Sequence, residues 1–192
     1  MAITGTIVSD KVRQWAAQVI NSATSLVTSF SVNGYAVNPS ELPKVADALR
    51  TGRIWLGYLP DGTDFHAGYV SGGYMLIDRR ANKQKLVLTQ SKLIHEAIHA
   101  AFDLRGGTSP FEIGSFIDEA CAYTAEAMYL RRQGVLPSEV IDHKPLAIGW
   151  RAAASTQSAG NVSKFIINEF NAVLAEYGYL KTSRRKAGFD QH

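Results

Sequence analysis

The stretch "SKLIHEAIHAAFD", Ser91–Asp103, carries two histidines four positions apart. Residues at this spacing lie one above the other on a helix, so His95 and His99 can direct two imidazole rings at one metal ion. Glu96 is rotated by about 100° around the helix axis. Its carboxylate would therefore miss the ion but reach a water molecule bound to it. The pattern predicts a zinc-binding catalytic helix; the alternative is an ordinary helix whose histidines are core or surface residues.

A second helix is expected to complete the site, because catalytic zinc usually has three protein ligands and one open position. The third histidine of the spacing HExxHxxGxxH is absent, since residue 105 is arginine. The stretch "FIDEACAYTAEAMYL" (116–130) instead supplies Glu119, at the border of an apolar helical stripe where an unpaired carboxylate is costly to bury. We predict Glu119 as the third ligand; the alternative is a boundary glutamate paired with lysine or arginine. Glu126 is a rival ligand or an acceptor for a histidine N–H.

The sequence before this site predicts helices followed by a small sheet. Ser9 and Asp10 can cap a first helix that runs to about Thr28, and Ser40 can cap a second that stops at Gly52. Short runs of β-forming residues then alternate with turns, which predicts four strands with short connections and therefore a mostly antiparallel sheet. These runs are "RIWLGYL" (53–59), "FHAGYV" (65–70), "GYMLID" (73–78) and "KLVL" (85–88).

The sequence after the sheet is helical, so helices and strands are not interleaved and we predict an α+β fold. Ser91 is expected to cap the metal-binding helix, which ends at Gly106–Gly107, and the next helix runs to Arg132. Two further helices are expected within 137–155 and 161–180. We expect a single domain, 1–192, with N-terminal helices (1–52), a sheet (53–88), a helical part with the metal site (89–180) and a basic flexible tail (181–192).

Composition excludes cysteine-based sites. The 192 residues contain one cysteine, Cys121, so neither a disulfide within the chain nor a cysteine zinc cluster can form. The net charge of +3 is small and part of it lies in the tail, which is typical of a solvated segment, so nucleic-acid binding is not expected. No signal peptide or membrane-spanning segment is recognised. We expect no membrane insertion, and a cytoplasmic location or export by a non-classical route; the oligomeric state stays open.

"HEAIH" (95–99), followed after twenty residues by a glutamate on another helix, resembles the thermolysin-like arrangement of the gluzincin zinc metallopeptidases. The resemblance spans roughly Phe65–Leu130 and implies a zincin-like fold. It implies one Zn²⁺ per chain held by His95, His99 and Glu119, with Glu96 as the general base of a metalloendopeptidase acting on a peptide or protein substrate. One alternative is a catalytically inactive zincin-fold scaffold or interaction module that binds the metal. Another is a metal-free helical partner protein.

The resemblance also implies substrate contacts, and this chain differs from the family pattern at some positions. An edge strand near Ala67–Val70, with Ala67 and Tyr69 as substrate-binding candidates, would pair with the extended substrate; the alternative is a plain hairpin strand.

Thermolysin-like enzymes have an aspartate four residues after the glutamate ligand, where this chain has Tyr123. Tyr123 is an oxyanion donor or a core residue. His143 is the candidate for the downstream oxyanion histidine, or a loop histidine before a helix. Asp103 is a candidate acceptor for His99, or a solvated partner of an arginine.

Overall fold

The computed structural model describes residues 6–60, 67–70, 73–79, 86–105 and 115–176. Within these ranges the chain forms six α-helices and two small sheets, which confirms the predicted α+β class. The helices are α1 (Asp10–Ser22), α2 (Leu42–Arg50), α3 (Leu86–Arg105), α4 (Ser115–Arg132), α5 (Lys144–Ala159) and α6 (Lys164–Glu176). Short 3₁₀ turns η1 (Ala23–Ser25), η2 (Pro39–Glu41) and η4 (Pro137–Glu139) extend or precede helices. The predicted tail, 181–192, lies outside the described residues.

The larger sheet has four strands in the order β1 (Thr6–Ile7), β4 (Trp55–Tyr58), β6 (Tyr74–Ile77) and β5 (Ala67–Val70). Two of the three pairings are antiparallel, as predicted, but β4 and β6 are parallel. Short connections suggested that consecutive strands pair with each other. Instead, β5 follows β4 in sequence but lies at the edge of the sheet, and β6 lies between β4 and β5. β5 is therefore an edge strand of the sheet, with β6 as its inner neighbour.

The start of α3 corrects two predictions. Residues 86–88, predicted as the end of the strand "KLVL", form the first turn of α3, and Ser91 lies inside the helix instead of capping it. No glycine or proline separates this apolar run from the residues that follow, and a short apolar run does not by itself distinguish a strand from a helix. The Ser91 hydroxyl donates to the Leu88 carbonyl oxygen at 2.9 Å. The predicted stop at 106–107 lies outside the described residues.

The first helix begins as predicted but ends early, whereas the second begins differently and stops just before Gly52 as predicted. Ser9 caps α1 and accepts a hydrogen bond from the Val12 N–H at 3.4 Å. The helix ends at Ser22, short of Thr28, and continues only as the 3₁₀ turn η1. Ser40 is not a cap, because Asn38 caps the turn η2 that precedes α2.

A hairpin that the sequence analysis left unassigned follows η1. Its strands are β2 (Phe30–Val32) and β3 (Tyr35–Val37), paired antiparallel. Asn33 and Gly34 have φ values of 50° and 86°. Positive φ at both central residues is the geometry of a type I′ turn, for which Asn-Gly is the preferred pair.

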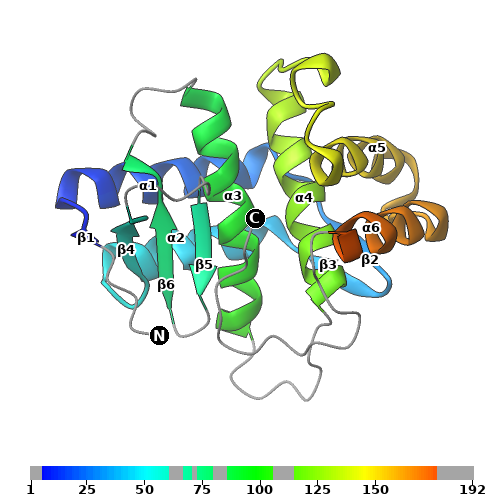
Figure 1. Cartoon of the computed structure of the whole chain (residues 1–192). Coiled ribbons are helices and arrows are strands. Elements are labelled where there is room, and N and C mark those ends of the chain that lie inside the picture. Colours follow the sequence, from blue (N-terminus) through cyan, green and yellow to red (C-terminus); the bar gives the residue numbers. More distant parts are fainter. Residues whose placement is uncertain (1–5, 61–66, 71–72, 80–85, 106–114, 177–192) are drawn as a thin grey trace.

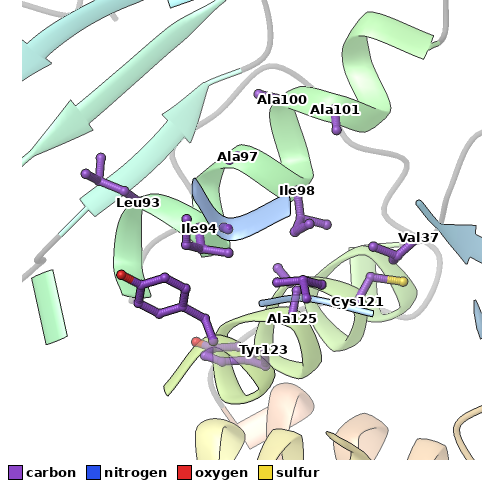
Figure 2. Close-up of a cluster of buried hydrophobic side chains, with 14 of the residues drawn as sticks. Val37, Leu93, Ile94, Ala97, Ile98, Ala100, Ala101, Cys121, Tyr123 and Ala125 are labelled. Atoms are coloured by element: carbon purple, nitrogen blue, oxygen red, sulfur yellow. The ribbon is translucent and has the colours of Figure 1, made fainter. Parts of the chain in front are cut away.

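α3 is the central element and carries the histidines into the interior. It packs against α1, α2, α4 and β5, and in Figure 1 it lies between the sheet on one side and α4 on the other. Figure 2 shows Ile94 and Ile98 of α3 and Ala125 of α4 within one apolar cluster. Among the residues that the structure describes, no helix is both long and apolar enough to cross a membrane.

Gly149 allows α5 to approach α4 closely. A Cβ at this position would lie 2.5 Å from the Tyr123 carbonyl oxygen and 2.8 Å from its carbonyl carbon. Alanine is favoured over glycine inside a helix by about 1 kcal/mol, so Gly149→Ala would stabilise a helix without this contact. We expect the opposite, a loss of about 1–3 kcal/mol in the free energy of unfolding, because the backbone of α4 must move. Urea unfolding measures the sign, and a stabilised variant would contradict the close approach.

Candidate metal centre

Three side chains from α3 and α4 converge in the interior. His95 and His99 lie on one face of α3, and their Nε2 atoms are each 3.3 Å from an oxygen of Glu119 on α4. One ligand atom from each residue lies within 4.8 Å of the others. The three residues are 3%, 0% and 2% exposed. The structure thus brings together the three residues that the sequence predicted as metal ligands.

The tautomers of the histidines decide what this cluster can hold. Both Nδ1 atoms lie within hydrogen-bonding distance of carboxylate oxygens, so both donate an N–H, and in neutral rings the Nε2 atoms carry lone pairs. Those lone pairs would face carboxylate oxygens of Glu119, so each Nε2 atom either carries a proton that it donates to Glu119 or binds a cation. Two ligands of a tetrahedral zinc ion with bonds of about 2.0–2.1 Å lie roughly 3.3–3.4 Å apart. The observed separations fit such an ion.

Each histidine is oriented by a carboxylate behind it. His95 Nδ1 is 3.1 Å from Glu126 Oε2, and His99 Nδ1 is 2.8 Å from Asp118 Oδ1. Such contacts fix the ring orientation and raise the basicity of the ligating nitrogen. Glu126 therefore accepts a hydrogen bond from a histidine N–H, which was one of its two predicted roles. It is not one of the three clustered ligands.

Asp118 is a contact that the sequence analysis missed. The predicted acceptor Asp103 is exposed on α3, whereas Asp118 is buried and bonded to the His99 ring. Asp118 directly precedes Glu119, so it emerges from α4 about 100° away from the ligand. The spacing alone does not say whether that direction leads behind His99 or into solvent, because the answer depends on how α3 and α4 cross.

Glu126 is the centre of a buried polar network. Its Oε1 accepts from the Ser91 hydroxyl at 3.0 Å and pairs with the Lys92 ammonium at 2.9 Å, while Oε2 holds His95. Burial disfavours the charged form, but the charge of Lys92 and the contacts with His95 hold the pKa of Glu126 well below its usual range. Glu126 is therefore an ionised carboxylate.

The centre is rich in carboxylates. Four buried carboxylates (Glu96, Asp118, Glu119 and Glu126) lie around the histidines, and among the described residues Lys92 pairs with one of them, Glu126. Burial lowers the pKa of His95, but hydrogen bonds with Glu119 and Glu126 and the charge of Glu96 raise it to about 10. Buried charges are tolerated when they are paired or coordinate a metal. A divalent cation among the histidines would interact favourably with these carboxylates.

Glu96 lies beside the ligands without joining the cluster. It follows His95 on α3, it is 6% exposed, and its charge acts on His95. It is not among the three residues whose ligand atoms converge. Glu96 is thus buried close to His95, and its role as general base stays a prediction.

Tyr123 and His143 lie beyond His95. The Tyr123 ring is 2% exposed and packs edge-on against the His95 ring, with 4.4 Å between centroids. The His143 ring lies 5.6 Å from that of Tyr123. His143 is the N-cap of α5: its Nδ1 accepts from the Leu146 N–H at 3.3 Å. His143 thus lies directly before a helix, as expected for the loop-histidine alternative, but its side chain is partly buried.

A cavity of about 180 Å³ adjoins this network and shares Glu126 with it. Its walls are largely apolar, from Leu88, Val140 and Leu146, with Lys92 and His143 also exposed to the space. An apolar cavity of about 150 Å³ holds a benzene ring. This cavity therefore has room for one apolar side chain.

The predicted substrate residues lie on the edge strand β5. Ala67 is partly exposed, but Tyr69 is 3% exposed and belongs to the core, opposite Met75 of β6. The Tyr69 side chain is therefore committed to packing, and the strand can offer a substrate only its backbone at that position. His66 lies outside the described residues.

Cys121 takes no part in the centre. It is fully buried, and burial raises the pKa of its thiol well above the usual value. Figure 2 shows it beside Val37 in the apolar cluster. It is absent from the three-residue group.

Comparisons with protein-family models, with curated proteins and with solved structures return no match. The argument for function therefore rests on the residues and geometry of this chain.

His143 is expected to make stability depend on pH. Burial and the charge of Lys92 lower its pKa from 6.5 to about 4 in the folded protein. Between these values the unfolded chain binds the extra proton, so this contribution to stability is complete above pH 6.5 and is lost as pH falls towards 4. His143→Asn keeps a capping acceptor and removes the titration. Urea unfolding across this range should give the variant a shallower pH dependence than the wild type; equal slopes would contradict the buried neutral histidine.

Proposed function

We propose that the chain is a zinc-dependent peptidase of zincin-like fold and gluzincin-like arrangement. His95, His99 and Glu119 hold one zinc ion. The convergence of these three ligands beside Glu96, with Nε2–O separations of 3.3 Å, is the observation that carries the proposal. The resemblance of "HEAIH" and Glu119 to the gluzincins supports the same assignment. The edge strand β5 next to α3 gives an extended peptide a place to pair.

The mechanism assigns a role to each residue. A bound zinc ion would polarise the scissile carbonyl and lower the pKa of a water molecule to about 7. Glu96 would accept a proton from the attacking water and deliver it to the leaving amine as the C–N bond breaks. Glu126 and Asp118 keep the two imidazoles oriented with Nε2 towards the metal. The cavity beside Glu126 accepts one apolar side chain of the substrate.

The proposal is tested by product analysis in water enriched in heavy oxygen. Zinc-loaded protein is incubated with a mixture of unstructured peptides, and the fragments are analysed by mass spectrometry. We expect new carboxyl termini that carry one heavy oxygen atom, because water is the nucleophile. Cleavage no greater than that of a Glu96→Gln variant prepared in parallel would contradict the assignment.

A second function, metal binding without hydrolysis, is favoured by the burial of the centre. The ligands are at most 3% exposed and Glu96 is 6% exposed, as in the closed sites that hold structural zinc. The position of Tyr123, where thermolysin-like enzymes have an aspartate, points the same way. A structural site predicts stoichiometric zinc and no peptide cleavage, and it predicts that Glu96→Gln changes neither.

A further inference from the structure

A second hollow, of about 200 Å³, is formed by α4 and α5 together with the segment after η1. It shares no residue with the metal centre. Arg131 and Arg132, in the last turn of α4, lie twelve and thirteen residues beyond Glu119. The distance along the helix axis is therefore about 18 Å. We call this space the arginine hollow; Thr28 and Gln157 also line it.

The arginine hollow is positively charged. Arg131 and Arg132 are its charged lining residues, and no carboxylate is among the lining residues. In the part of the chain that the structure describes, the ion-paired arginines are others: Arg13, Arg50, Arg105 and Arg151. Basic residues in a last turn offset the negative end of the helix dipole. That effect explains their place in the sequence, but not their convergence with Gln157 of α5 around one space.

Arg131 is held in place by Trp150. Its Nη1 donates to the Trp150 carbonyl oxygen at 3.2 Å, and its guanidinium carbon lies 5.6 Å from the centre of the indole ring. A guanidinium has five N–H donors, so the contact with one carbonyl leaves most of them available. The group is thereby fixed before a ligand arrives, which reduces the entropy lost on binding.

We propose that the arginine hollow binds a phosphate group, as inorganic phosphate or as a small phosphomonoester. Two guanidinium groups match the several oxygens of a phosphate, whereas one suffices for a carboxylate. Gln157 and Thr28 line the same space, and the Gln157 amide adds a neutral donor, whereas the Thr28 hydroxyl donates to Met128 Sδ at 3.6 Å. The volume exceeds the roughly 150 Å³ that holds a benzene ring, so it admits a phosphate with a short ester group. This site is independent of the peptidase proposal.

The test is a titration of the zinc-loaded full chain with inorganic phosphate and, separately, with glycerol phosphate at constant ionic strength. The side-chain Nε–H resonances of the arginines are followed by NMR. We expect saturable shifts of Arg131 and Arg132, and a loss of affinity of about tenfold or more in Arg131→Gln and in Arg132→Gln. Tighter binding of the ester identifies a phosphomonoester as the ligand, and equal or weaker binding identifies free phosphate.

The matched control is Arg151→Gln, which makes the same change of charge on α5 but outside the arginine hollow. Its affinity for phosphate should equal that of the wild type. Three results would overturn the proposal: no saturable shift with either ligand, equal weakening by all three substitutions, or binding that persists in both Arg131→Gln and Arg132→Gln. The last result would place the anion elsewhere, for example at the metal.

Discussion

Glu96→Gln is expected to lower the rate of peptide hydrolysis by roughly 10²–10⁴-fold, the range for loss of a general base. Glutamine keeps the size and shape of the side chain but cannot accept the proton of the attacking water. Because Glu96 is not among the three converging ligands, zinc content should remain that of the wild type. The loss should appear in kcat, with KM little changed, since the residue acts after the substrate is bound.

The matched control for this result is Glu169→Gln, the same change at a half-buried glutamate of α6 that pairs with Arg151, outside the metal centre. It should leave both activity and zinc content unchanged. A Glu96→Gln variant that keeps full activity would remove Glu96 from the mechanism. If it loses zinc together with activity, Glu96 acts on the metal and not on the water.

The second large effect is expected from removal of the metal. A chelator leaves the carboxylates around His95 and His99 without their dication, and it also removes the free energy of metal binding from the folded state. Free zinc at 1,000 times its dissociation constant stabilises a protein by about 4 kcal/mol. For a chain of this size, that corresponds to a fall in Tm of roughly 10 °C when the metal is removed.

Scanning calorimetry with and without chelator measures this shift. The control is Glu119→Gln, which replaces one of the three ligands with a side chain of the same shape. Its Tm should be lower than that of the zinc-loaded wild type and should respond little to the chelator. A wild type whose Tm is the same with and without chelator would mean that the cluster holds no metal, and that the centre is stabilised by protons on its histidines.

The helix spacing was enough to place His95 and His99 on one face of α3. Glu119 was predicted from the cost of burying a carboxylate beside an apolar stripe, with Glu126 as a rival that only the packing of α3 against α4 could decide against. Asp118 was not predictable in the same way. Its contact with His99 depends on how α3 and α4 cross, which local sequence does not encode.

The fold class was predictable because the order of helices and strands is a local property. The parallel pairing of β4 with β6 was not, because it depends on which strand takes the edge of the sheet. The predicted start of α3 was wrong because "LVL" (86–88) suits a strand and a helix equally. Only packing in the interior determines which of the two structures these residues form. The β2–β3 hairpin could have been predicted from the sequence, because Asn33-Gly34 between short apolar runs is a strong turn signal.

The most direct test of the account is the metal content of the purified protein. The chain is prepared without a histidine tag, and zinc per chain is determined by elemental mass spectrometry before and after zinc is offered, beside Glu119→Ala. We predict about one zinc per chain in the wild type, from the single three-ligand cluster, and much less in the variant. A wild type that holds almost no zinc even after zinc is supplied would contradict the metal centre and the peptidase function that depends on it.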